Sequence, residues 1–256
     1  MFLSAAGGVC GISIADTFFG ESPTGLIELK NYRYPVYLYV PQNYKPDRTY
    51  PLIVSIPKAG ESPEKNIQYW TNLAKRRSML VVSAENLRPE DVPYAMDEWL
   101  LGILKDIKGR YRIDEGKVFL AGREGGAHYA AYLATNYPAY FSAAVLMDGS
   151  WSGPYEALLN PKNRAVKQVP FLVVAHGDDN ELTQIEKKAL KFEEKGYLVS
   201  LLRVPEKGTY DSDDFKKKIL EWLTEKSDVW QGVVKDSQKS FKEKTYAWFE
   251  NFFRVQ

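Results

Sequence analysis

The stretch GREGG at residues 122–126 places a chemically active side chain between glycines. It follows an apolar run typical of a buried strand and leads into a segment with a helical pattern. A sharp turn from strand to helix, with glycines two residues before and two after its centre, is the geometry that presents a nucleophile in acyl-transfer enzymes. Glycines are needed there because the central residue is strained and neighbouring backbones approach closely. The central residue here is Glu124, where such an enzyme has serine, cysteine or aspartate.

Glu124 and His128 are four residues apart at the start of the expected helix, so their side chains can share one face. A carboxylate–imidazole pair at this position could bind a metal ion or a cationic ligand. A later loop supplies further polar side chains: His176, Asp178 and Asp179. Alternatively, His128 packs beneath the turn and Glu124 forms an ion pair with Lys58 or Arg123. Some partner is expected, because a buried glutamate without one would be costly.

Strands and helices alternate along residues 25–226. The expected strands are residues 26–29, 36–40, 51–56, 79–84, 117–121, 143–147, 171–175 and 198–204. The expected helices are residues 63–78, 94–108, 125–136, 181–195 and 213–226. This alternation predicts one α/β domain with a mostly parallel sheet covered by helices on both faces, and antiparallel pairing of the first two strands. Ligands bind at the carboxyl ends of the strands in such sheets, so the loops there are the candidates for chemistry.

Composition excludes several classes of function. The 256 residues include 34 basic and 33 acidic side chains, so the chain lacks the basic excess of a protein that binds nucleic acid by phosphate attraction. The single cysteine, Cys10, excludes an internal disulfide and a cysteine-based zinc cluster. With two histidines in the chain, neither a metal nor a cofactor is expected. No apolar stretch reaches the roughly 18 residues of a transmembrane segment.

The two ends of the chain lie outside the alternating region. Residues 1–24 begin with an apolar leader, which is either part of an export signal or an extension that packs on the domain. Residues 227–256 form the expected C-terminal helical extension, and its six aromatic side chains between positions 241 and 253 exceed what a free surface helix would expose. We therefore expect a protein partner, or a second copy of the chain, to contact both ends.

Several further segments occur in a characteristic order. They are YLYVP at 37–41, YPLIV at 50–54, YRID at 111–114, KVFLAG at 117–122, YP at 137–138 and the strand at 143–149. In this order and spacing the chain resembles the α/β-hydrolase superfamily, and within it the polyhydroxybutyrate depolymerase and feruloyl esterase group. The resemblance covers residues 25–226 and implies an α/β-hydrolase fold with a sheet of about eight strands.

The catalytic positions that the resemblance implies are altered in this chain. It places the nucleophile at Glu124 and the histidine base at Tyr210. It places the acid at Asn180, although Asp179 could serve after a shift of one residue. The equivalents of the oxyanion loop are Pro57, Lys58 and Gly125. Since a Ser–His–Asp device acts as a unit, four simultaneous changes argue against hydrolysis by the family mechanism.

The sequence therefore favours a catalytically inactive, esterase-like protein that acts as a binding or assembly module. The alternative is an active carboxylic ester hydrolase with a rearranged site that uses no serine, such as Asp179 with His128 or His176. The family resemblance and the apolar leader together favour an exported protein, with a cytoplasmic location as the alternative.

Overall fold

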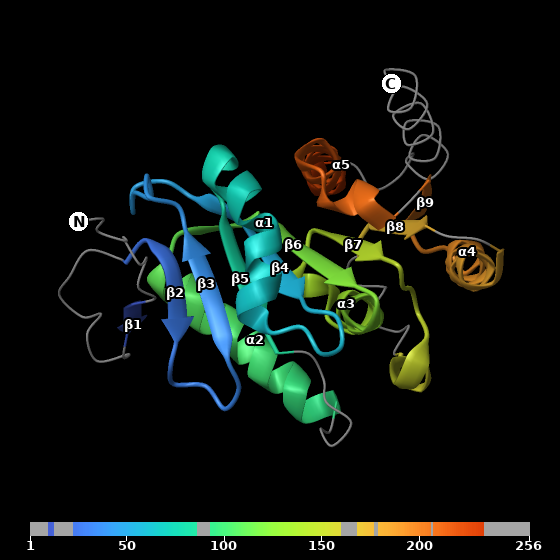
Figure 1. Ribbon diagram of the computed structural model, residues 1–256, viewed down its shortest axis with the longest axis horizontal. Helices are drawn as coiled ribbons and strands as arrows, with labels where there is room; N and C mark the ends of the chain where they lie inside the picture. Colours follow the sequence, from blue (N-terminus) through green and yellow to red (C-terminus); the bar gives the residue numbers. More distant parts are fainter. Residues whose placement is uncertain are drawn as a thin grey trace, which may run out of the picture.

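The computed structural model describes residues 10–12, 23–85, 93–159, 168–176, 179–205 and 207–232. These residues form a single sheet of nine strands between two layers of helices, in the order β1-β2-β3-β5-β4-β6-β7-β8-β9 (Figure 1). Within the described ranges, no helix combines the length and the apolar character needed to cross a membrane.

The sheet is mostly parallel, as the sequence predicts. The strands are β1 (Cys10–Ile12), β2 (Gly25–Leu29), β3 (Val36–Val40), β4 (Tyr50–Ile56), β5 (Leu80–Ala84), β6 (Ile113–Arg123), β7 (Ala143–Met147), β8 (Phe171–His176) and β9 (Val199–Val204). β3 runs antiparallel to its neighbours β2 and β5, and the other pairs are parallel. β5 and β7 are buried along their whole length, as expected for strands covered on both faces.

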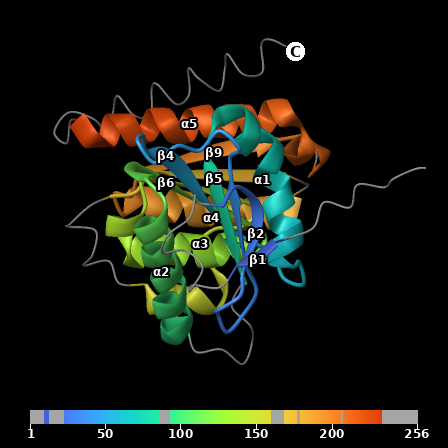
Figure 2. The same cartoon turned by 90° about the vertical axis from the view of Figure 1, so that its left-hand side faces the viewer.

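Helices cover both faces of the sheet (Figures 1 and 2). They are α1 (Pro63–Arg77), α2 (Pro93–Arg110), α3 (Gly125–Asn136), α4 (Asp179–Glu194) and α5 (Asp213–Gly232). Short 3₁₀ helices include η3 (Gly153–Leu158) and η5 (Lys207–Asp211). Side chains of α1 and α5, such as Trp70 and Trp222, pack into the core on one face. Side chains of α2, α3 and α4, such as Leu100, Tyr129 and Phe192, pack into the core on the other.

β1 is the strand that the sequence does not predict. It lies within the segment expected to be a leader, and it pairs in parallel with β2, with Cys10 opposite Ile27. The other eight strands agree with the expected number. The start of α5 is also as predicted, since the hydroxyl of Ser212 accepts a hydrogen bond from the backbone N–H of Phe215 at 3.1 Å.

A buried carboxylate connects α2 to α3. Asp97 of α2 is fully buried and accepts hydrogen bonds of 2.8, 2.5 and 2.9 Å from three phenol groups, those of Tyr129, Tyr132 and Tyr137. Burial raises the pKa of Asp97, and the three donors oppose this rise because they stabilise the carboxylate. Since α3 begins at the turn that carries Glu124, this cluster fixes the helix behind the candidate site.

Asp97→Asn should change how stability depends on pH. Because burial makes the pKa of Asp97 higher in the folded than in the unfolded chain, the folded state binds this proton more tightly. The wild type should therefore lose free energy of unfolding relative to Asp97→Asn as the pH rises from about 4 through the folded pKa. Urea unfolding of both proteins between about pH 4 and pH 8 measures this difference. If the wild type instead gained stability relative to Asp97→Asn as the pH rises, the pKa of Asp97 would not be raised in the folded chain.

Candidate functional site

Glu124 lies at the tip of the turn between β6 and α3, as the sequence predicts. Its backbone has φ 50° and ψ −121°, a conformation that side-chain-bearing residues rarely adopt. Its N–H donates to the carbonyl oxygen of Met147 at 2.8 Å, which ties the tip to the neighbouring strand β7. The strained turn therefore presents the Glu124 side chain at the carboxyl ends of the central strands.

The glycines around the turn are required by close approach of the backbone. A Cβ atom at Gly122 would lie 2.3 Å from the carbonyl oxygen of Gly126, and one at Gly126 would lie 2.4 Å from that of Pro57. A Cβ atom at Gly149, which follows β7, would lie 2.7 Å from the carbonyl oxygen of Glu124. No side chain fits at these positions unless the backbone moves.

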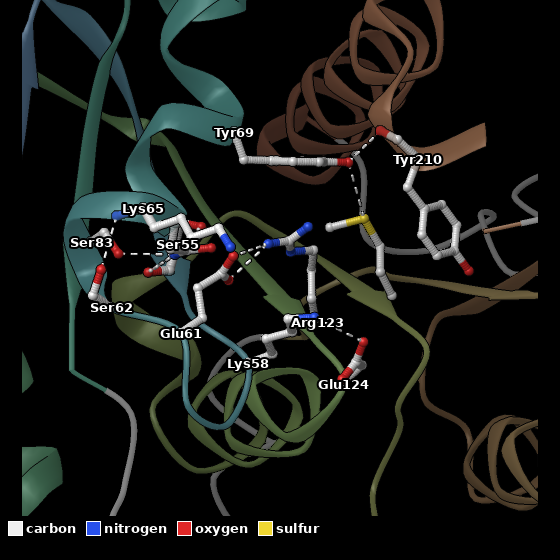
Figure 3. A network of polar contacts seen from close by, with 12 residues as sticks. Ser55, Lys58, Glu61, Ser62, Lys65, Tyr69, Ser83, Arg123, Glu124 and Tyr210 are labelled. Atoms are coloured by element: carbon white, nitrogen blue, oxygen red, sulfur yellow. Dashed lines mark hydrogen bonds and ion pairs between the residues drawn. The ribbon is translucent and has the colours of Figure 1, made fainter. Parts of the chain in front are cut away.

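Lys58 is the ion-pair partner of Glu124 (Figure 3). Its Nζ lies 3.7 Å from Glu124 Oε1, and the two side chains are 37% and 38% exposed. The sequence offered Lys58 and Arg123 as alternatives for this partner. At this exposure the pair is screened by water and adds little to stability, but it places an ammonium group where the resemblance puts the oxyanion loop.

Arg123 points away from Glu124 toward α1 (Figure 3). Its Nη2 donates to both carboxylate oxygens of the buried Glu61 at 2.7 Å, and its guanidinium lies 4.5 Å from the centre of the Tyr69 ring. The ammonium of Lys216 lies 4.2 Å from the same ring centre, and burial lowers the pKa of Lys216. The Tyr69 hydroxyl donates to the backbone carbonyl of Tyr210 at 2.6 Å. These contacts hold the loop after β9 against the strand-to-helix turn at Glu124, which we call the elbow.

Asp148, directly after β7, contacts side chains at the end of β8 and after β9. Its Oδ1 accepts hydrogen bonds from the Tyr210 hydroxyl at 2.6 Å and from the backbone N–H of His176 at 3.2 Å, and it lies 2.6 Å from His176 Nδ1. Burial raises the pKa of Tyr210 far above that of an ordinary phenol, and the hydrogen bond and charge of Asp148 add to the rise. Sequence reasoning missed Asp148, although its place directly after a central strand was the signal that could have found it.

The two histidines and the polar loop at residues 178–180 do not all lie at the pocket beside Glu124. His128 lies at hydrogen-bond distance from the Ser150 carbonyl oxygen and the Ser152 hydroxyl, at 2.7 and 2.9 Å through Nδ1, and does not line the pocket at Glu124. His128 therefore contacts the loop that follows β7, through Ser150 and Ser152. Asp178 lies outside the described residues, as do the side chains of Asp179 and Asn180 at the start of α4.

A pocket of about 180 Å³ opens beside the elbow. It is lined by Lys58, Arg123, Glu124, Met147, Asp148, Tyr210 and Asp211. In the part of the chain that the structure describes, no three His, Cys, Asp or Glu side chains are placed to hold a metal ion. Glu124 and Tyr210 thus line one pocket, and the resemblance assigns to them the nucleophile and the base. Lys58, at the oxyanion-loop position, lines the same pocket.

The sequence matches no known family model and no curated protein, but solved structures match it. FphF, a fluorophosphonate-binding serine hydrolase of Staphylococcus aureus, has a TM-score of 0.60 at 14% identity, over 80% of this chain and 99% of that one. A ferulic acid esterase has a TM-score of 0.59 at 12% identity, over 75% and 92% of the two chains.

A thermostable esterase has a TM-score of 0.58 at 20% identity, over 78% of this chain and 62% of the esterase. The present chain thus spans less than two thirds of that enzyme's length. These three structures are esterases or serine hydrolases, and each likeness covers 75–80% of this chain. The strand order, the strained turn at Glu124 and these likenesses together identify the fold of this chain as the α/β-hydrolase fold.

Proposed function

We propose that this protein is a non-hydrolytic, esterase-like protein whose pocket serves binding or assembly. The observation that carries the proposal is Glu124 at the tip of the elbow, where an acyl-transfer enzyme of this fold presents its nucleophile. A carboxylate is a poor nucleophile toward an ester, because the anhydride that it would form is more reactive than the ester itself. Its ion pair with Lys58 weakens it further.

The position of the base supports the same proposal. The Tyr210 hydroxyl donates a hydrogen bond to Asp148, and burial raises the pKa of Tyr210 far above neutrality. A phenol in this state can neither accept a proton from a nucleophile nor return one to a leaving group at neutral pH. Without nucleophile and base, only the roughly 10³–10⁴-fold acceleration from binding and oxyanion contacts would remain.

The oxyanion-loop position is also changed. Pro57 has no backbone N–H and so supplies no donor for an oxyanion. Lys58 follows it and places its ammonium beside Glu124. Lys58 and Glu124 both line the pocket, and their charges favour a charged ligand over a neutral ester.

The assembly part of the proposal rests on the ends of the chain. Residues 1–24 and 227–256 carry apolar and aromatic side chains beyond the expected α/β domain, although residues 10–12 form β1 and residues 227–232 end α5. The aromatic segment at 241–253 lies outside the described residues. Contact with a protein partner or a second copy of the chain is therefore proposed from composition.

Ester hydrolysis at a rearranged site is a second candidate function, and one contact favours it. His176 Nδ1 lies 2.6 Å from Asp148 Oδ1, a distance at which a carboxylate orients an imidazole and stabilises its protonated form. An imidazole oriented in this way could activate a water molecule through its other nitrogen, without a serine.

Ester turnover by the wild type separates the two candidates. We expect hydrolysis of short-chain nitrophenyl esters no faster than by Glu124→Ala or His176→Gln, and no labelling by a fluorophosphonate probe. Turnover by the wild type that is lost in His176→Gln would establish the second candidate. Turnover lost in Glu124→Ala would make Glu124 a catalytic residue and would refute the proposed function.

A further inference from the structure

Charges of opposite sign flank the elbow on opposite sides. Lys58 follows β4, which lies beside β6 on one side, and Asp148 follows β7, which lies beside β6 on the other. Asp211 follows β9, farther along the side of Asp148. A ligand in this pocket therefore meets the ammonium of Lys58, with the Glu124 carboxylate beside it, on one side and the carboxylates of Asp148 and Asp211 on the other.

Both charges can bind a ligand. Lys58 Nζ lies 3.7 Å from Glu124 Oε1, which is beyond hydrogen-bond distance, so its donors can turn to a ligand. The three contacts of Asp148 within the described residues all involve Oδ1, and a carboxylate has more acceptor sites than these contacts use, so Asp148 can also accept from a ligand in the pocket that it lines. Arg123, by contrast, is engaged by Glu61 at 2.7 Å.

The size of the pocket limits the ligand. An engineered cavity of about 150 Å³ binds benzene, so a pocket of about 180 Å³ holds roughly seven non-hydrogen atoms. Met147 and the ring of Tyr210 offer apolar contact for a short aliphatic group. A ligand with a single charge would form a charge-assisted hydrogen bond with only one of Lys58 and Asp148, whereas a ligand with both charges would form two.

We propose that the pocket binds a small zwitterion, such as a free α-amino acid with a short side chain. The ligand carboxylate lies toward Lys58 and its ammonium toward Asp148. This proposal rests on the non-hydrolytic function proposed above, because it assigns to the same pocket a ligand without an ester bond.

Three probes of matched structure test the charge requirement. They are 2-aminobutyrate, butyrate, which lacks the ammonium, and n-propylamine, which lacks the carboxylate. Binding is measured at pH 7.5 through the ¹³C-methyl NMR signal of Met147, assigned with Met147→Leu. We expect 2-aminobutyrate to shift this signal saturably and each single-charge probe to bind at least about 10-fold more weakly, since a charge-assisted hydrogen bond is lost. Equal affinity for either single-charge probe would overturn the proposal.

Variants of Lys58 and Asp148 test whether these side chains bind the carboxylate and the ammonium of the ligand. Lys58→Gln and Asp148→Asn should each weaken 2-aminobutyrate binding at least about 10-fold. The matched controls Lys75→Gln and Asp47→Asn, at exposed positions away from the pocket lining, should leave it unchanged. Asparagine tolerates the backbone φ of 53° at position 148 and keeps an acceptor for Tyr210. If Asp148→Asn nevertheless unfolds, Lys58→Gln against Lys75→Gln decides, and unchanged affinity in Lys58→Gln refutes the proposal.

The same samples distinguish this proposal from the function on which it rests. Nitrophenyl acetate is added to each after the NMR titration. Turnover by the wild type would refute the non-hydrolytic function, whatever the amino acid does. Absence of both turnover and amino-acid binding would refute the zwitterion site and leave the proposed function standing.

Discussion

Glu124→Ser alone should leave the hydrolysis of a short-chain nitrophenyl ester no faster than in the wild type. A serine at this position has the strained turn behind it but no base beside it. Tyr210 cannot accept the serine proton, because its own proton is held by Asp148 and its pKa is raised by burial. The measurement is kcat/KM for both proteins. A large gain in the single variant would show that the rest of the device is intact.

Glu124→Ser combined with Tyr210→His should raise kcat/KM by at least about 100-fold over the single variant, the lower range for general-base catalysis. Asp148 already lies 2.6 Å from the Tyr210 hydroxyl, so it is placed to orient an imidazole that replaces the phenol. An imidazole is shorter than a phenol, so η5 must move toward Asp148 for this contact to form. The resemblance assigns the acid to Asn180 instead, which predicts that repair also needs Asn180→Asp.

Two further variants show which carboxylate orients the imidazole at position 210. Asp148→Asn in the double variant should remove most of the gain, because loss of the orienting carboxylate costs roughly 10⁴ in a serine protease. Asn180→Asp, added to the double variant, should raise kcat/KM by a smaller factor than the factor by which Asp148→Asn lowers it. If Asn180→Asp proves essential and Asp148→Asn harmless, the acid belongs at position 180 and the assignment to Asp148 is wrong.

Gly126→Ala should destabilise the protein by at least about 3 kcal/mol, the upper range for overpacking. Its new Cβ would lie 2.4 Å from the carbonyl oxygen of Pro57 and 2.6 Å from that of Ile56, and backbone atoms cannot rotate away. The matched control is Gly102→Ala, also in a helix, where a Cβ meets nothing within 4 Å. The control should gain about 0.5–1 kcal/mol, because alanine has the better helix propensity.

The free energy of unfolding in urea measures both glycine variants. Expression of a folded Gly126→Ala protein with the stability of the wild type would show that the loop after β4 can retreat. The close packing of α3 on that loop would then not be what requires glycine at this position.

The fold was largely predictable because its elements have strong apolar patterns. The helix at 125–136 and the strands at 36–40 and 143–147 agree with the sequence-based expectation at every residue. β6 is longer than the expected 117–121, since it begins at Ile113 opposite Tyr50 although polar residues follow Ile113. β1 was missed because three residues in an apolar segment show no alternation; its pairing with β2 is a tertiary contact.

The site was less predictable than the fold. The glycine spacing pointed to Glu124, and the family resemblance pointed to Tyr210 and Lys58. It could not choose Lys58 over Arg123, since Glu61 and Tyr69, which engage Arg123, lie more than fifty residues away in the chain. Asp148 was missed because the resemblance directs attention to the loop after the next strand, and the partners of its carboxylate come from two other strand ends.

The strand order has a consequence for how the domain is made. The first five strands, complete by residue 84, are contiguous in the sheet. β4 lies at the edge of this group, because its second neighbour, β6, comes later in the chain. Beyond β4, the strands β6, β7, β8 and β9 follow one another across the sheet in sequence order, so each can pair with a strand that was synthesised before it. Non-local parallel pairing is slow in general, but here each step extends an existing template. The pocket acquires Tyr210 and Asp211 with the last addition, so on the ribosome it is completed after every strand of the sheet.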